Sequence, residues 1–226
     1  MAAKFADEII VLSKGVQQYF QDTYNRETKL IPNGVNGVQN REPEIIKEKY
    51  GLDKEDYILF LARIVPEKGL DYLIDAYKQV KTDKKLVIAG GASHTKDYYE
   101  TIKEKAQSDD RIILTGFVQG QEMEELYSNC YLYVLPSDIE GMPISLLEAM
   151  SYGRNCLVSR IEENVQVTEK FATTFEKSNS EDLRKKLEQC LAEKNRYEAE
   201  EIAEFVLGKY DWDDVVNQTE TLYKKG

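Results

Sequence analysis

The chain has 226 residues, a length that suits one large domain or two small ones. It is 42% hydrophobic and 31% charged, so it has the residues for a core and is not a disordered tail. Its 41 acidic residues outnumber 30 lysines and arginines, and the net charge of −11 argues against a nucleic acid partner held by bulk electrostatics. No apolar run approaches the roughly 20 residues of a membrane-spanning helix, and the first ten residues do not resemble a signal peptide.

Short runs rich in valine, isoleucine, leucine and aromatic residues recur along the chain and predict strands. They cover residues 8–13, 29–32, 57–64, 85–91, 111–117, 131–137 and 156–160. Helical patterns lie between them, at 66–80, 95–107, 121–129 and 143–153. This alternation predicts an α/β protein: a Rossmann-like parallel sheet with helices on both faces, formed by residues 1–226 as one domain.

Two helical segments have recognisable apolar faces. In 66–80, Leu70, Leu73, Ile74 and Tyr77 lie on one side. From residue 180 onward the chain is expected to be helical and highly charged. Its last segment, 210–225, carries an apolar stripe. The residues of that stripe are Trp212, Val215, Val216 and Leu222.

The loops that follow strands are the candidate binding sites, because ligands of open parallel sheets bind beyond the carboxyl ends of the strands. In the first of these loops, Arg63 and Lys68 place two cations near the start of a helix, a combination that suits a diphosphate. Solvated surface cations are the alternative. In a second loop, Phe117 and Val118 lie between two glycines, where exposed backbone suits the edge of a flat base. An ordinary glycine turn is the alternative there.

A third loop contains the segment EGMPISLLE, residues 140–148. We expect Pro143 as the first helical residue. Met142 before it has no side chain that caps a helix, so the first N–H groups of the helix are predicted to be free for an anion. Ser145 adds a hydroxyl group at the same place.

Two glutamates lie at the ends of this segment. Glu148 shares a helix face with Ile144, about one turn below the mouth of the helix. If a phosphate binds at the mouth, Glu148 is expected to reach hydroxyls on one side of it, and Glu140, in the loop, hydroxyls on the other side. A phosphate with polyols on both sides describes a nucleotide sugar. A loop acid and a helix-surface acid are the alternative interpretations of the two residues.

Three segments together carry a family resemblance: LARIVPEKGLDYLIDAY, RIILTGFV and YVLPSDIEGMPISLLEAMSYG. They resemble the C-terminal, donor-binding half of the retaining glycosyltransferases of family 4, also called group 1. The resemblance extends over nearly the whole chain. It implies one half of the B-type glycosyltransferase fold, with an N-terminal acceptor domain that is absent from this chain. The isolated domain is then expected to be inactive or very weak.

By matching position, the resemblance also implies roles for individual residues. Arg63 and Lys68 would hold the diphosphate and stabilise charge on the leaving group, and Glu140 would contact the donor sugar; these three are the catalytic candidates. Glu148 would bind ribose hydroxyls. The other donor-binding candidates surround the base and the phosphate: Phe117, Val118, Gly141, Met142, Pro143, Ile144 and Ser145.

The resemblance implies retention of configuration and no bound metal or other cofactor, only a nucleotide-sugar substrate such as a UDP- or GDP-sugar. The acidic segment DWDD, 211–214, superficially resembles an Asp-x-Asp metal site. Because it precedes a helix, we expect it to cap that helix instead. His94, the only histidine, is expected to be a solvated loop residue rather than a general base. Ala62 and Asn36 depart from frequent family residues and leave the donor's identity open.

The expected partner is an acceptor sugar or glycolipid, in polysaccharide or glycolipid biosynthesis, with self-association through the stripe on 210–225. A fold-related phosphorylase, an epimerase and a non-catalytic nucleotide-binding module remain alternatives. Cys130, Cys156 and Cys190 are odd in number and far apart, which indicates structural thiols in a reducing compartment. The expected location is therefore cytoplasmic, with the inner membrane surface as an alternative for a full-length enzyme.

Overall fold

The computed structural model describes residues 5–91, 96–193 and 196–224, and its centre is a six-stranded sheet. All the strand pairs are parallel, in the order β5-β4-β3-β6-β7-β8. The strands are β3 (Tyr57–Leu61), β4 (Lys85–Ala89), β5 (Ile112–Gly116), β6 (Leu132–Leu135), β7 (Cys156–Ser159) and β8 (Ala172–Phe175). The predicted fold class is confirmed. The strand β8 was not among the predicted strands.

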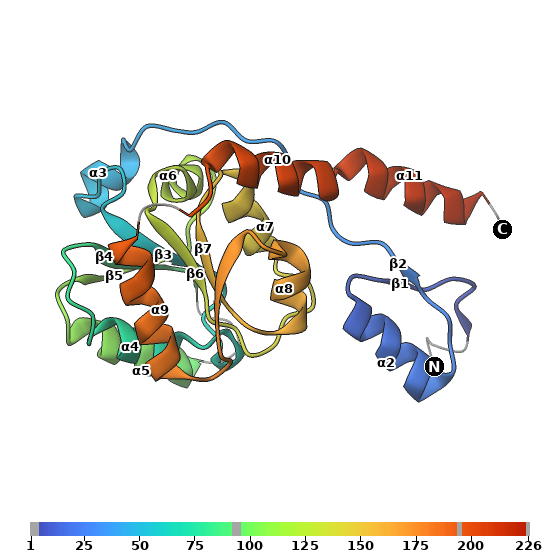
Figure 1. Cartoon of the computed structure of the whole chain (residues 1–226), viewed down its shortest axis with the longest axis horizontal. Coiled ribbons are helices and arrows are strands. Elements are labelled where there is room, and N and C mark those ends of the chain that lie inside the picture. The colour runs from blue at the N-terminus through green and yellow to red at the C-terminus, as the bar shows by residue number, and fades with distance from the viewer. Residues whose placement is uncertain (1–4, 92–95, 194–195, 225–226) are drawn as a thin grey trace.

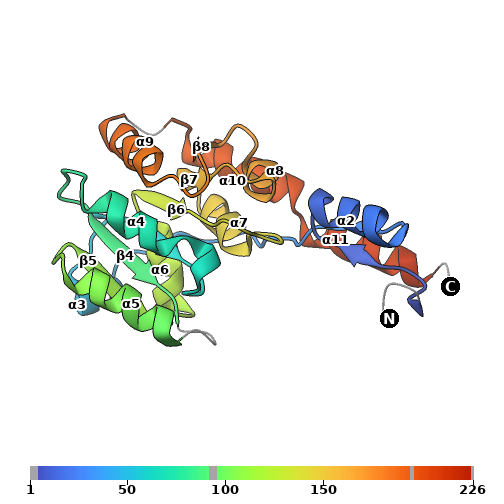
Figure 2. The same cartoon turned by 90° about the horizontal axis from the view of Figure 1, so that it is seen from below.

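Helices cover both faces of this sheet (Figure 1, Figure 2). Along β3, Ile58 and Phe60 pack into one buried cluster and Tyr57 and Leu59 into another, as the alternation of side chains along a strand requires. One cluster includes residues of α4 (Leu70–Tyr77), α5 (Lys96–Gln107) and α9 (Ser180–Ala192). The other includes residues of α3 (Ile45–Tyr50), α6 (Gln121–Asn129), α7 (Ile144–Ser151), α8 (Glu162–Thr168) and α10 (Ala199–Lys209).

The predicted helices are present, with small differences at their ends. The pattern at 66–80 is a 3₁₀ turn, η1 (Pro66–Lys68), followed by α4. All four residues predicted for its apolar face are fully buried: Leu70, Leu73, Ile74 and Tyr77. The helical C-terminal region is confirmed by α9, α10 and α11 (Trp212–Tyr223).

The first part of the chain forms a separate unit rather than two more strands of the large sheet. It consists of β1 (Ile10–Val11), α2 (Lys14–Tyr24) and β2 (Lys29–Leu30), and its two strands pair only with each other. Figure 1 shows this unit apart from the large sheet. The prediction that 8–13 and 29–32 join that sheet is therefore wrong. Ile10 and Leu12 remain exposed, whereas the central strands are apolar and buried on both faces.

Helix α11 extends away from the sheet toward the side where α2 lies (Figure 1, Figure 2). Asp211 caps it: its carboxylate accepts hydrogen bonds from the N–H groups of Asp213 and Asp214, at 2.7 and 3.1 Å. The capping role predicted for DWDD is confirmed. No residue of α11 is buried, so the apolar stripe on 210–225 has little covering.

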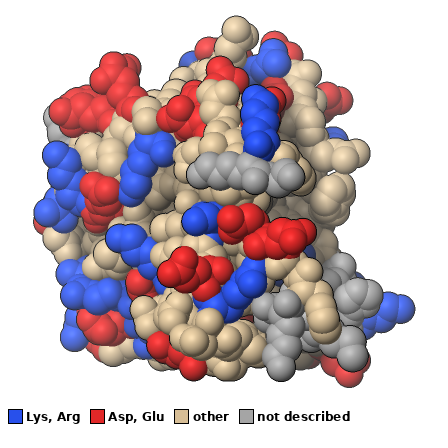
Figure 3. All heavy atoms as spheres, turned by 90° about the vertical axis from the view of Figure 1, so that its right-hand side faces the viewer, with Lys and Arg blue, Asp and Glu red and all other residues tan. Residues whose placement is uncertain are grey.

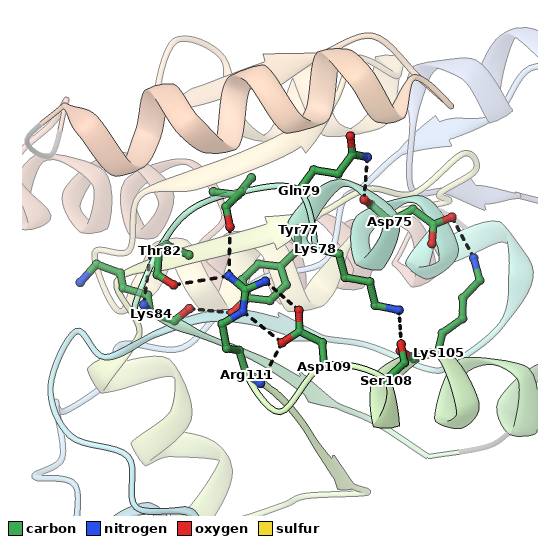
Figure 4. Close-up of polar contacts among 11 residues, drawn as sticks. Asp75, Tyr77, Lys78, Gln79, Thr82, Lys84, Lys105, Ser108, Asp109 and Arg111 are labelled. Carbon is green, nitrogen blue, oxygen red and sulfur yellow. Dashed lines mark hydrogen bonds and ion pairs between the residues drawn. The ribbon is translucent and has the colours of Figure 1, made fainter.

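A polar network joins the elements at the amino-terminal edge of the sheet (Figure 4). Arg111, just before β5, donates to both carboxylate oxygens of Asp109 at 3.0 and 2.7 Å. The same guanidinium donates to the backbone carbonyl of Val80 at 3.0 Å and lies over the ring of Tyr77, 4.8 Å from its centroid. This clamp fixes the end of α4 against the start of β5, at the edge opposite the candidate site.

Two further predictions concern the chain as a whole. Within the described residues, no helix is long and apolar enough to cross a membrane. The cysteines are free thiols: Cys130 and Cys156 are buried and Cys190 is partly buried. Burial raises the pKa of each thiol, and the interpretation as structural thiols is supported.

Candidate functional site

The loops after β3 and β6 lie against each other at the carboxyl edge of the sheet. The N–H of Asp138 donates to the carbonyl of Glu67 at 2.8 Å, and the Tyr72 hydroxyl donates to the carbonyl of Pro136 at 3.1 Å. Gly69 lets them come this close: its φ is +66°, and an added Cβ would lie 2.3 Å from the Pro136 oxygen. The two loops that carry predicted site residues are thus fixed to one another.

Lys68 and Glu140, one from each loop, form an ion pair with 2.5 Å between Nζ and Oε1. Their side chains are only 12% and 5% exposed. Ser137 donates a second hydrogen bond, of 2.6 Å, to the same Glu140 oxygen. Sequence reasoning placed Lys68 and Glu140 in one site but did not foresee that they touch. It also missed Ser137, because contacts inside an irregular loop follow no sequence period.

Arg63 follows β3 and its side chain is exposed. Within the described part of the chain it makes no hydrogen bond or ion pair. Its guanidinium therefore remains available for an anionic ligand, as predicted, and the alternative of a solvated surface cation is equally compatible with this geometry.

The start of α7 differs from the prediction at one residue. Pro143 is the N-cap residue and not the first helical residue, because its φ of −79° and ψ of 84° form an inverse γ-turn. In that turn the N–H of Ile144 donates to the carbonyl of Met142 at 3.0 Å, so it is not free for an anion. The amides of Gly141, Met142 and Ser145 have no hydrogen-bond acceptor among the described residues. They leave three donors at the mouth of the helix.

Glu148 points toward α6 from the second turn of α7. The Tyr127 hydroxyl donates to its Oε2 at 2.9 Å. Burial raises the pKa of the Glu148 carboxyl, and the hydrogen bond from Tyr127 opposes that rise. The hydroxyl of Ser145 is also in use, as the acceptor of a 2.8 Å hydrogen bond from Tyr133.

Ile144 and Glu148 share a face, as predicted, and both line a cleft of about 440 Å³. The same cleft is also lined by residues 34–39, which lie between the N-terminal unit and the large sheet, and by Trp212 of α11. These two parts of the lining were not predicted as site residues. Nothing in the local sequence indicates that segments so far apart meet beside Glu148.

Phe117 and Val118, after β5, differ from each other in exposure. The Phe117 side chain is 73% exposed, whereas Val118 is 6% exposed and packs into the core beneath α6 and α7. Only the backbone of Val118 is therefore able to meet a ligand. The flanking Gly116 and Gly120 have φ of +76° and +58°, which explains the glycines on each side. His94 lies outside the described residues.

The amino-acid sequence of the chain matches a known protein family. Residues 42–204, more than half of the chain, match the family described as glycosyl transferases group 1. The chain belongs to this family, as the resemblance implied. Its sheet and helices form one half of the B-type glycosyltransferase fold.

Individual relatives support this assignment. The chain is 27% identical over 233 residues to the uncharacterized glycosyltransferase MJ1607 of Methanocaldococcus jannaschii, a match that covers 96% of this chain and 60% of that protein. It is 34% identical over 112 residues to alpha-D-kanosaminyltransferase of Streptomyces kanamyceticus, covering 48% of this chain and 29% of that protein. The matches thus span 60% and 29% of these relatives' lengths, less than two thirds of each.

Among solved structures, Alr3699/HepE of Anabaena in complex with UDP and glucose has the same fold. The TM-score is 0.86 at 21% sequence identity, and the superposition covers 99% of this chain and 65% of that one.

Proposed function

We propose that this chain is the donor-binding part of a glycosyltransferase and binds a nucleotide sugar such as a UDP- or GDP-sugar. With a further domain that holds an acceptor sugar or glycolipid, it transfers the glycosyl group with retention of configuration. The observation that carries the proposal is the arrangement at the mouth of α7. There, the N–H groups of Gly141, Met142 and Ser145, which have no acceptor among the described residues, follow Glu140 in the chain, whose carboxylate pairs with Lys68 from the loop that also carries Arg63.

The diphosphate is the part of the ligand best matched by this geometry. The N–H groups of Gly141, Met142 and Ser145 and the positive end of α7 suit phosphate oxygens. The Lys68 ammonium has three donors, so it is able to bind phosphate while one donor stays on Glu140. Together with Arg63 it supplies positive charge to the leaving diphosphate, and the proposal therefore includes no metal or other cofactor.

The two glutamates then bind the sugars on either side. Glu148, beside the 440 Å³ cleft, accepts hydrogen bonds from ribose hydroxyls. Glu140 is held with one oxygen toward Lys68 and contacts the donor sugar with the other. The solved HepE structures in complex with UDP and with UDP-glucose support the choice of ligand class, since each superposes on 99% of this chain.

No nucleic acid is part of the proposal. Figure 3 shows acidic and basic side chains interspersed on the side of the molecule where α2 and α11 lie in Figure 1. A nucleic acid-binding face gathers lysine and arginine into one patch or stripe instead.

The test is a calorimetric series on the 226-residue chain with UDP, GDP and ADP and with their sugars. We expect one base to bind, with a Kd on the order of 0.1–1 mM because the chain spans only part of the length of its relatives, and with no requirement for magnesium. Uridine or guanosine alone is expected to bind far more weakly. Absence of heat with every nucleotide would contradict the donor site. Product analysis with an added acceptor domain separates a transferase from a phosphorylase, an epimerase or a non-catalytic module.

A further inference from the structure

Behind Glu140 lies a row of buried polar side chains that the proposed function does not use. Ser137, Ser159 and Asn164 are each fully buried. They come from three elements: the loop after β6, the last residue of β7, and α8. Buried polar groups are costly unless they are hydrogen-bonded, so a continuous row of them requires a reason.

The hydrogen bonds of this row lead toward Glu140. Asn164 donates to the Ser159 hydroxyl at 3.0 Å, and the Ser159 hydroxyl donates to the backbone carbonyl of Ser137. The Ser137 hydroxyl then donates to Glu140 Oε1 at 2.6 Å. The carbonyl of Ser137 is thus fixed by β7 and α8, while its hydroxyl is directed at the carboxylate.

The two oxygens of Glu140 have different surroundings. Oε1 accepts from both Ser137 and Lys68. Oε2 accepts no hydrogen bond from any described residue. It is also not one of the fully buried polar atoms without a partner, so it retains some exposure to solvent. One oxygen is therefore held by the protein, and the other is accessible to a ligand.

We propose that Ser137 is a positioning residue that orients the Glu140 carboxylate so that Oε2 faces the donor sugar. Ser137 is fully buried and acts only through Glu140. Lys68 does not suffice for this task, because its ammonium lies on a flexible stem and is also the cation that a diphosphate attracts. When the Lys68 ammonium divides its donors between phosphate and Glu140, the Ser137 hydroxyl still holds Oε1 in place. The inference rests on the proposed function only in naming the sugar as the partner of Oε2.

A first test needs no ligand. Crystal structures of the Lys68→Ala chain and of the Lys68→Ala/Ser137→Ala chain show what holds Glu140. We expect Glu140 to keep its position in the single variant and to adopt other rotamers in the double variant. If Glu140 moves already in Lys68→Ala, or stays in place in both, the positioning role is wrong. If the double variant does not fold, Ser137→Cys replaces Ser137→Ala, because a thiol has similar size but is a weak donor.

A second test measures binding of the nucleotide and the nucleotide sugar selected by the calorimetric series. Ser137→Ala is expected to lower affinity for the nucleotide sugar about 3- to 10-fold, the size of a single hydrogen bond, and to leave affinity for the nucleoside diphosphate unchanged. In a Glu140→Ala background, Ser137→Ala should cause no further loss. Additive losses, or an equal loss for both ligands, would mean that Ser137 only supports the fold.

A matched control is Ser128→Ala, which removes another buried serine hydroxyl that forms a hydrogen bond, to the N–H of Arg41. It is expected to change neither affinity. If the wild-type chain binds no nucleotide at all, the proposed function fails, and the crystallographic comparison still decides whether Ser137 positions Glu140.

Discussion

At the scale of single residues, Glu148 combines its proposed binding role with a cost to stability. Because burial raises the pKa of its carboxyl, the ionised form is disfavoured in the folded state. This destabilisation is absent below the unfolded pKa of about 4.3. It grows as the pH rises through the folded-state pKa and is complete above it.

We therefore expect Glu148→Gln to raise the free energy of unfolding by roughly 0.5–1 kcal/mol at neutral pH, a value kept small by partial exposure. The gain should disappear as the pH falls toward about 4. The same substitution should weaken nucleotide binding. Urea unfolding at several pH values measures the first effect and calorimetry the second. Glu48→Gln, which changes an exposed acid on α3, is the control; a stability loss at neutral pH in Glu148→Gln would contradict the argument.

Arg63 and Lys68 are both predicted to bind the diphosphate, but their surroundings predict that replacing each by alanine has a different effect on stability. Arg63→Ala should weaken nucleoside diphosphate binding by about 1.5–3 kcal/mol and leave stability unchanged, because Arg63 is exposed. Lys68→Ala should also lower the free energy of unfolding, by roughly 1–3 kcal/mol, because it leaves the Glu140 carboxylate buried without its cation. Calorimetry and urea unfolding on both variants test this difference. Lys105→Ala, which removes an exposed ion pair with Asp75 away from the candidate site, is the control and should change neither nucleotide binding nor the free energy of unfolding.

At the scale of elements, the clamp between Arg111 and Asp109 fixes α4 against β5 (Figure 4). The hydrogen bonds from Arg111 lower the pKa of the Asp109 carboxyl. A lowered carboxyl pKa contributes stability above the unfolded pKa, and this contribution is lost as the pH falls through the folded-state pKa.

Asp109→Asn is thus expected to destabilise the chain by about 1 kcal/mol at pH 7. This is the energy of a charge-assisted hydrogen bond, reduced because the pair is partly exposed to solvent. The difference should shrink below about pH 3.9. Urea unfolding at pH 7 and at successively lower pH provides the measurement. The neighbouring, exposed Asp110→Asn serves as control. An equal effect of both substitutions at every pH would exclude the clamp as the cause.

The elements also show what the sequence is able to predict. Central strands such as β3 and β4 were predictable because they are apolar on both faces, and α6 because its pattern lies between a glycine and a strand. The separate pairing of β1 and β2 was not, since a two-residue strand carries no sign of its partner. The charged and polar residues of the candidate site were predicted from their loops, but the contact between Lys68 and Glu140 depends on how closely two loops approach.

At the scale of the whole molecule, α2 and α11 lie on the same side, and neither contains a buried residue (Figure 1, Figure 2). Each has an apolar face. Tyr19 and Tyr24 are exposed on α2, and Trp212 and Val216 on α11. Exposed apolar faces of this kind favour association with another surface. We expect this chain, studied by itself, to self-associate at high concentration through α11.

The decisive change is Val216→Lys, because Val216 is 50% exposed and lies in the middle of the α11 stripe. A charge there has to be desolvated on association, so the dissociation constant should rise at least about tenfold, or roughly 1.4 kcal/mol. Sedimentation velocity over a range of concentrations measures it. Asn217→Lys adds the same charge at an exposed position on the other side of α11, about 100° around the helix from Val216 and farther from the rest of the stripe, and should leave association unchanged. Trp212 fluorescence reports on the same surface, and its maximum should shift to shorter wavelength as the wild-type concentration rises. A wild-type chain that stays monomeric throughout, with constant Trp212 emission, would show that the stripe is tolerated in water and that α11 is not an association surface.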